Sequence, residues 1–120
     1  MKAGNKTTGV RLRVVLAPGV ALGPGKADLL DGIRETGSIS AAGRAMQMSY
    51  KRAWSLVDEM NRWFADPLVT AETGGRKGGG AHLTALGETV LEAYRRMEDS
   101  AGTAVAEDLD ALSNKLGPPA

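Results

Sequence analysis

Residues 38–64, SISAAGRAMQMSYKRAWSLVDEMNRWF, contain two helical patterns separated by a short spacer at 46–49. The first pattern predicts a short helix at 40–46, with Ser40 or Ser38 as its N-cap. Its inward-facing residues are expected to be Ala42, Ala45 and Met46. The small residues at 41–43 would let another helix approach closely. Two helices joined by so few residues are typical of a helix-turn-helix.

The second pattern predicts an amphipathic helix at 49–64, the clearest in the chain. At 100° per residue, one broad arc collects Tyr50, Ala53, Trp54, Leu56, Val57, Met60 and Phe64. The other arc collects Lys51, Arg52, Ser55, Asp58, Glu59 and Arg62. Adjacent carboxylates at 58 and 59 point in different directions and have Arg62 nearby, which favours a solvated charged face over a catalytic pair.

Upstream of these helices, the pattern predicts one helix and one strand. The helix is expected at 25–36, with Gly37 ending it and Gly32 a weak point inside it. Alternating Val10, Leu12, Val14 and Leu16 predict a strand with one buried face. Residues 1–9 carry little apolar content and are expected to form a flexible arm.

Downstream, residues 68–83 predict a hairpin of two strands. Its expected mobile tip, 74–80, holds five glycines around Arg76 and Lys77. Thr84 is expected to cap a last helix that Gly102 interrupts. The predicted fold is mainly α with a small β-hairpin, a winged helix-turn-helix at 10–101. A C-terminal helical tail at 102–120 is expected to end in a disordered Gly-Pro-Pro-Ala.

Composition excludes several functional classes. The 120 residues include no cysteine and one histidine, His82, so disulfides, thiolate sites and His-rich metal sites are excluded. The glycine tip lacks the Gly-x4-Gly-Lys-[Ser/Thr] pattern of a nucleotide-binding loop. We therefore expect no enzymatic activity and no cofactor. No apolar run approaches the ~20 residues that span a bilayer, so we expect a cytoplasmic protein.

The charges are unevenly distributed along the chain. Residues 1–81 hold 12 Lys+Arg and 7 Asp+Glu, a balance of +5, whereas residues 82–120 hold 3 and 7, a balance of −4. A basic first part and an acidic last part favour a nucleic-acid partner for the first part.

Double-stranded DNA is the partner that the helix-turn-helix pattern predicts, because an α-helix fits the major groove. The expected contacts come from the start of helix 49–64, with Ser49, Tyr50, Lys51, Arg52 and Ser55. The start of the short helix adds phosphate contacts from Ser38 and Ser40. The hairpin tip adds Gly75, Arg76, Lys77 and Gly78. Plain caps, a near-core Trp54 and a solvated basic face are the structural alternatives.

Several motifs in order resemble the N-terminal domain of the molybdate-responsive repressor ModE, a winged helix of the LysR type. They are Ser38-Ile39-Ser40, Ser49-Tyr50-Lys51-x-Ala53-Trp54, Glu59-Met60-Asn61, Leu68-Val69, Thr73-Gly74-Gly75-x-Lys77-Gly78-Gly79-Gly80-Ala81, and Leu83-Thr84-x-x-Gly87 with Tyr94. The match runs from about 25 to 98. Arg76 departs from the expected pattern of the hairpin tip.

The resemblance implies a transcriptional regulator that binds a pseudo-palindromic operator as a homodimer. The last helix is the expected dimer element, with the N-terminal strand as the rival. ModE continues into oxyanion-binding domains, which the 120 residues do not match, so molybdate binding by this chain is not expected. The alternatives are a protein-interaction module that docks on another regulator or a molybdenum-pathway protein, and an oxyanion carrier that uses the glycine tip.

Overall fold

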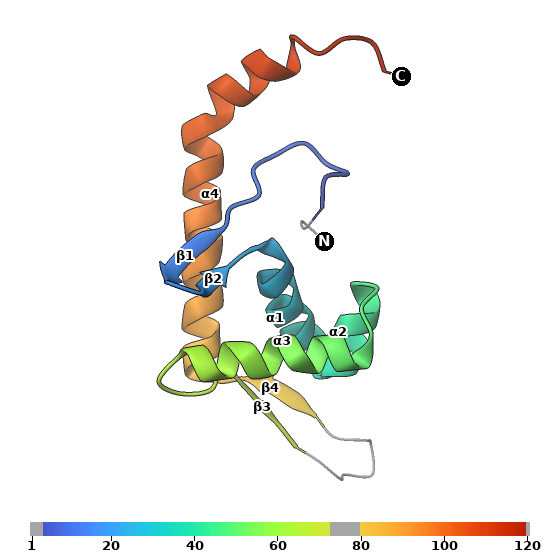
Figure 1. Ribbon diagram of the computed structural model, residues 1–120, viewed down its shortest axis with the longest axis vertical. Helices are drawn as coiled ribbons and strands as arrows, with labels where there is room; N and C mark the ends of the chain where they lie inside the picture. Colours follow the sequence, from blue (N-terminus) through green and yellow to red (C-terminus); the bar gives the residue numbers. More distant parts are fainter. Residues whose placement is uncertain (1–3, 73–79, 120) are drawn as a thin grey trace.

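The structure is a computed structural model that describes residues 4–72 and 80–119. Its elements are β1 (Val14–Ala17), β2 (Val20–Leu22), α1 (Pro24–Thr36), α2 (Ile39–Ala45), α3 (Tyr50–Trp63), β3 (Val69–Ala71), β4 (Ala81–Leu83) and α4 (Ala85–Ser113). The strands form two antiparallel hairpins, β1–β2 and β3–β4. This arrangement confirms the mainly α, winged helix-turn-helix fold (Figure 1).

The core lies between α1, α2 and α3, and α4 and β4 pack against α1. Its most deeply buried side chains are Leu29, Leu30, Ile33, Val57, Met60, Leu68, Leu91 and Tyr94. Gly37 ends α1 in the left-handed region, with φ 68°, and its N–H donates to the Ile33 carbonyl at 2.8 Å. The predicted end of this helix is therefore confirmed.

The short helix α2 begins one residue earlier than predicted. Ser38 is its N-cap and accepts from the Ala41 N–H at 3.0 Å, so Ser40 lies in the first turn. The buried residues of α2 are Ile39, Ala42 and Gly43, spaced i, i+3 and i+4, whereas Ala45, the last residue of the helix, lies six positions after Ile39 and off this stripe, and is exposed. The expected burial of Ala42 is confirmed, and that of Ala45 is wrong.

The N-terminal segment forms a hairpin in place of the single predicted strand. Residues 18–19 turn the chain from β1 to β2, with Gly19 at φ 79°, and a register shift lies between Val15 and Ala17. Leu16 is 48% exposed, so its expected burial is wrong. Strand β2 has only three residues between two turns that contain Pro and Gly, so it is too short to show an alternating pattern of apolar and polar residues.

The hairpin β3–β4 is joined to the start of α4 by Thr84. Its hydroxyl donates to the Pro67 carbonyl at 2.7 Å and accepts from the Gly87 N–H at 3.0 Å. Gly87 packs against the backbone of Leu68 so closely that a Cβ there would lie 3.0 Å from the Leu68 carbonyl carbon. The predicted Thr84 cap is confirmed.

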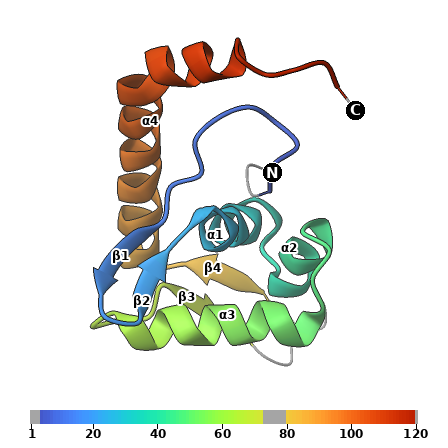
Figure 2. The same ribbon diagram turned by 45° about the horizontal axis from the view of Figure 1, so that its top comes forward.

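Helix α4 is continuous through Gly102, so the predicted interruption there is wrong. One glycine costs a helix about 1 kcal/mol, which the alanine-rich residues around it tolerate. The helix bends toward its C-terminal end, which stands clear of the three-helix core (Figures 1 and 2). This end is exposed, with Leu112 69% accessible, and Leu116, just beyond the helix, is 77% accessible.

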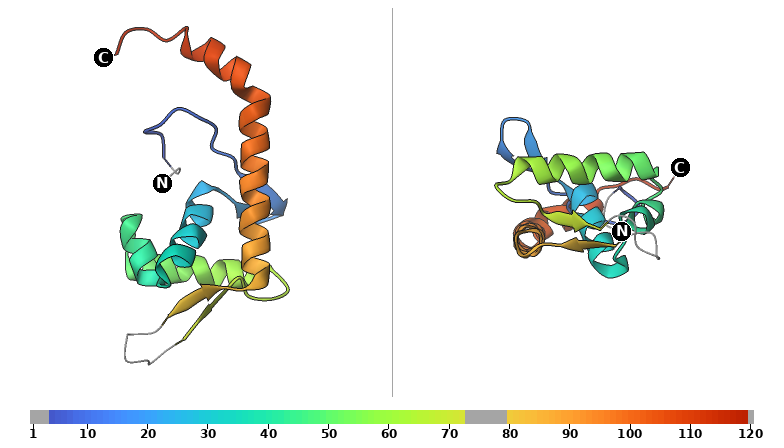
Figure 3. Two further views of the ribbon diagram at one scale, coloured as in Figure 1. Left: turned by 180° about the vertical axis from the view of Figure 1, so that it is seen from behind. Right: turned by 90° about the horizontal axis from the view of Figure 1, so that it is seen from below.

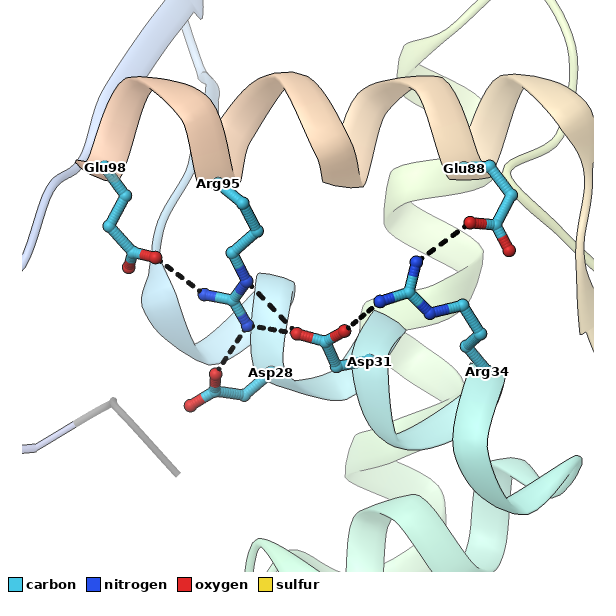
Figure 4. A network of polar contacts seen from close by, with 6 residues as sticks. All are labelled: Asp28, Asp31, Arg34, Glu88, Arg95 and Glu98. Atoms are coloured by element: carbon cyan, nitrogen blue, oxygen red, sulfur yellow. Dashed lines mark hydrogen bonds and ion pairs between the residues drawn. The ribbon is translucent and has the colours of Figure 1, made fainter. Parts of the chain in front are cut away.

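A ladder of ion pairs joins α4 to α1 (Figure 4). The Arg95 guanidinium bonds Asp28 at 2.9 Å, Glu98 at 3.0 Å and also Asp31. Burial alone would lower the pKa of Arg95, but its hydrogen bonds to Asp31, Asp28 and Glu98 raise it. Arg34 extends the ladder to Glu88 at 2.9 Å. The ladder fixes α4 over the helix that supports α2.

Within 4–72 and 80–119, no helix is both long and apolar enough to cross a bilayer.

Candidate nucleic-acid interface

The turn between α2 and α3 is held by its own backbone. The N–H groups of Met46 and Met48 donate to the Gly43 carbonyl at 3.0 and 2.9 Å. Gln47 adopts the left-handed region with φ 59°, which is uncommon for a residue other than glycine and which no sequence pattern predicted. Gly43 also lies directly against Ala53, so the two helices cross at small residues. The predicted close approach at 41–43 is therefore confirmed, and it fixes the direction of α3.

The start of α3 carries the exposed polar residues that the sequence singled out. Ser49 is the N-cap and accepts from the Arg52 N–H at 3.0 Å. Lys51, Arg52 and Ser55 are exposed, and Tyr50 is 60% exposed, although its pattern had placed it on the apolar arc. Among the described residues, neither Lys51 nor Arg52 forms an ion pair, so both cations are available to a ligand.

The second half of α3 is electrostatically paired. Arg62 bonds Asp58 at 2.5 Å, as the spacing predicted, whereas Glu59 lies 3.7 Å from Lys26 of α1. The free positive charge of the helix is therefore concentrated in its first turns.

A small recess of about 50 Å³ lies beside the first turn of α2. Ser38, Ser40, Tyr50 and Trp54 line it, and the two serine hydroxyls lie 3.2 Å apart. The indole N–H of Trp54 is buried and has no hydrogen-bond partner among the described residues. The recess therefore offers the two serine hydroxyls to a ligand, whereas the indole nitrogen is covered and is not accessible from outside.

The end of β3 and the start of β4 lie beside this recess, through the residues at 71–72 and 80–81. Glu72 N–H donates to the Gly80 carbonyl at 2.7 Å, and Ala81 N–H donates to the Gly37 carbonyl at 2.9 Å. His82 is an exposed residue of β4, opposite Thr70. The predicted tip residues Gly75, Arg76, Lys77 and Gly78 lie outside the described residues.

Asn61 connects α3 to the hairpin, a function that residue patterns did not reveal. Its Oδ1 accepts from the N–H groups of Leu68 and Val69 at 2.8 and 3.1 Å, and its Nδ2 donates to the Val69 carbonyl at 3.0 Å. A polar residue within a partly buried stretch just before a strand was the available signal. Through Asn61, helix and hairpin are held as one unit.

No group of three or more His, Asp or Glu side chains suited to a metal ion occurs within the described ranges. The polar groups gathered at the start of α2 and the first turns of α3 are instead cations, hydroxyls and N–H donors, which suit an anionic ligand, while one carboxylate, Glu72, also lines the recess.

The chain has sequence relatives among proteins named MopB and ModE. It is 49% identical over 80 residues to the molybdenum-pterin-binding protein MopB of Rhodobacter capsulatus, covering 67% of this chain and 30% of MopB. It is 40% identical over 98 residues to the molybdenum transport protein ModE of Azotobacter vinelandii, covering 82% and 35%. The transcriptional regulator ModE of Haemophilus influenzae is 36% identical over 93 residues, covering 78% and 36%. The chain thus spans about a third of the length of these relatives, and the resemblance to ModE is confirmed.

Solved structures share the fold. The CbnR DBD–DNA complex matches 72% of this chain and 94% of its own with a TM-score of 0.56 and 23% identity. A MarR family transcription regulator matches 78% and 66% with a TM-score of 0.58 and 22% identity. At these identities the likeness concerns the fold alone.

The profile described as bacterial regulatory helix-turn-helix protein, lysR family, matches residues 27–88, which include α1, α2, α3 and the β3–β4 hairpin. This match covers more than half of the chain, and the chain belongs to that family of bacterial regulatory helix-turn-helix proteins.

Proposed function

We propose that this chain is a sequence-specific, DNA-binding transcriptional regulator of the ModE kind, acting in the cytoplasm and not as an enzyme. The proposal rests on two exposed cations in the first turn of α3, Lys51 and Arg52, neither of which has an ion-pair partner within residues 4–72 and 80–119. This turn is the part of a helix-turn-helix that reaches base edges in the major groove. Relatives named as transcriptional regulators support it.

The chemistry of each side chain indicates whether it would contact a base or a phosphate. Lys51, Arg52 and Ser55 project from the exposed face of α3 and would contact base edges, with Tyr50 beside them. Ser49 already accepts from the Arg52 N–H, but its hydroxyl proton remains available to a phosphate. Ser38 and Ser40 would position one phosphate at the recess. Gly75, Arg76, Lys77 and Gly78 of the hairpin tip complete the proposed set.

Alanine substitutions on α3 test this assignment. Lys51→Ala or Arg52→Ala should each cost about 1–3 kcal/mol of operator affinity if the side chain contacts a base. Arg62→Ala is the matched control on the same helix, because Arg62 is paired with Asp58 and lies beyond the first two turns. Unchanged affinity in both test variants, or an equal loss in the control, would show that α3 is not the base-contacting element.

We also propose that the chain acts as a homodimer through the C-terminal part of α4. Val105, Leu109 and Leu112 follow at spacings of four and three residues, which places them on one face of α4, and Leu116 comes three residues after the helix ends. Three of them are exposed by 37%, 69% and 77%, at Val105, Leu112 and Leu116. A second copy of the same face would cover them.

Sedimentation equilibrium tests the dimer. Leu112→Asp should convert a dimer to a monomer, whereas Ala111→Asp, with the same added charge at an exposed neighbour on another face, should leave it intact. A monomeric wild-type chain, or equal behaviour of the two variants, would remove α4 as the dimer element.

A further inference from the structure

A cleft of about 360 Å³ follows the side of α3 that faces away from the β3–β4 hairpin. Its walls are the β1–β2 hairpin, the first turn of α1, and the face of α3 that carries Arg52, Leu56 and Trp63. Viewed from below, the two hairpins lie on opposite sides of α3 (Figure 3, right). The exposed face of α3 with Lys51 and Ser55 therefore has a hairpin on each side.

The cleft is positively charged. Arg13, Lys26 and Arg52 line it together with a single carboxylate, Glu59, which leaves a formal balance of three minus one, or +2. Arg13 and Arg52 are exposed and have no ion-pair partner among the described residues. Lys26 lies 3.7 Å from Glu59 and 5.2 Å from the centre of the Trp63 ring, so its ammonium group is held at the edge of the cleft.

The backbone adds to this positive field. Helix α1 begins at Pro24 after an N-cap glycine, Gly23, whose position provides no side-chain acceptor, and its first turn contains no acidic residue. The first N–H groups of the helix are therefore not neutralised locally. A Cβ placed at Gly23 or Gly25 would meet nothing within 4 Å, so an anion can approach this backbone.

A helix in the major groove lies between two phosphate backbones, because the groove is about 12 Å wide and a strand borders each side. Contacts from the hairpin β3–β4 and the recess at Ser38 would engage one strand. We propose that the β1–β2 hairpin and the first turn of α1, through Arg13 and Lys26, bind the phosphates of the other strand. This inference rests on the proposed DNA-binding function and adds a second phosphate-contacting hairpin to it.

The negative charge of Glu59 would repel a phosphate in the cleft. Its removal therefore tests the proposal with an expected change in DNA affinity opposite to that of Arg13→Ala. Its side chain is 44% exposed and takes up part of the charge of Lys26. If a phosphate enters the cleft, removing the carboxylate should tighten DNA binding, while removing Arg13 should weaken it.

The experiment is fluorescence anisotropy of the full chain on a duplex from its own upstream region, over a series of salt concentrations. Arg13→Ala should weaken binding about five- to tenfold and reduce the slope of log K against log salt by about 0.9, the value for one phosphate contact. Glu59→Gln should tighten binding about two- to fivefold. Circular dichroism checks that both variants fold, which is expected because Arg13 is exposed and Glu59 is half-exposed.

Arg96→Ala is the matched control, since it removes the same charge from an exposed position on α4. An equal effect of Arg13→Ala and Arg96→Ala would show that only net charge matters and would overturn the proposal. Unchanged binding by Arg13→Ala would overturn it as well. If Arg13→Ala leaves DNA binding intact but abolishes saturable binding of inorganic phosphate or molybdate, the cleft is a free-oxyanion site and the DNA assignment is wrong.

A wild-type chain without salt-sensitive DNA affinity would overturn the proposed function together with this inference. Normal wild-type binding with an unaffected Arg13→Ala variant would overturn the inference alone.

Discussion

Gly43 of α2 and Ala53 of α3 lie in contact where the two helices cross, and a Cβ on Gly43 would lie 2.8 Å from the Cβ of Ala53. The same device joins α1 to α2, where a Cβ on Gly32 would lie 2.9 Å from the Cβ of Ala42. Both distances are shorter than real contacts between Cβ atoms. The three helices can therefore approach this closely only because positions 32 and 43 are glycines. The direction of α3 depends on these two crossings.

Gly43→Ala should therefore destabilise the fold, by about 1–3 kcal/mol, because the added methyl group forces α2 and α3 apart. Chemical denaturation measures the change. Gly102→Ala is the matched control in α4, where a Cβ would meet nothing within 4 Å, and it should stabilise the chain by up to about 1 kcal/mol. Equal effects of the two substitutions would contradict the packing argument.

Asn61→Ala should cost about 2–3 kcal/mol, because it removes three hydrogen bonds to the backbone of Leu68 and Val69. Amide hydrogen exchange at Leu68 and Val69 should accelerate at the same time. Asn61→Asp keeps an acceptor for both N–H groups and should lose less. A fully stable Asn61→Ala variant would show that the link between α3 and β3 does not contribute.

Arg95→Met should destabilise the chain by about 3–5 kcal/mol, because it leaves the buried Glu98 without its ion-pair partner and weakens the contacts of Asp28 and Asp31. Arg34→Met removes the exposed end of the same ladder and should cost only about 0–1 kcal/mol. Thermal or urea denaturation of both variants compares them directly. If Arg34→Met lowered the free energy of unfolding more than Arg95→Met, the contacts of Arg34, and not those of Arg95, would be the stabilising part of the ladder.

Tyr94 makes stability depend on pH in the alkaline range. Burial, followed by the charge of Glu98, raises the pKa of Tyr94, so the folded chain holds this proton more tightly than the unfolded chain. The stabilisation is complete below the unfolded pKa of about 10 and is lost as pH rises through the folded value. At neutral pH, Tyr94→Phe should lower the free energy of unfolding by about 1 kcal/mol, because it removes the hydrogen bond from the Tyr94 hydroxyl to the Leu12 carbonyl at 2.6 Å. Above pH ~10 the difference in stability between the wild type and the variant should shrink.

Urea denaturation at a series of pH values provides this comparison. Tyr50→Phe, at an exposed position, should change the free energy of unfolding by less than about 0.5 kcal/mol at neutral pH. A deficit of Tyr94→Phe that stays constant from neutral to alkaline pH would contradict the role given to burial.

Local patterns predicted much of this fold, because α1 and α3 each bury one clear stripe and end at recognisable stop signals. The short elements were harder: seven residues of α2 contain less than one full repeat of an apolar stripe, so the pattern placed Ala45 on the buried face and left out Ile39. Strand β2 has only three residues and escaped detection. The predicted interruption at Gly102 was wrong because a helix tolerates one glycine among good helix formers.

The candidate site was predictable where it is local and unpredictable where it depends on distant partners. Lys51 and Arg52 stand out from helical periodicity alone. Asn61 contacts residues seven and eight positions away, and Arg95 pairs with Asp28 and Asp31 across more than sixty residues. No periodicity encodes such pairs. The cleft that contains Arg13 could not be predicted, because it depends on the β1–β2 hairpin and the alternating residues predicted only one strand there.

The most direct test of the central claim is fluorescence anisotropy of the full chain on its own upstream region and on a random duplex, at two salt concentrations. The account predicts a preference of ~10³ or more for the specific duplex and an affinity that falls steeply as salt rises. Equal, weak binding to both duplexes would contradict it and would direct attention to a protein partner.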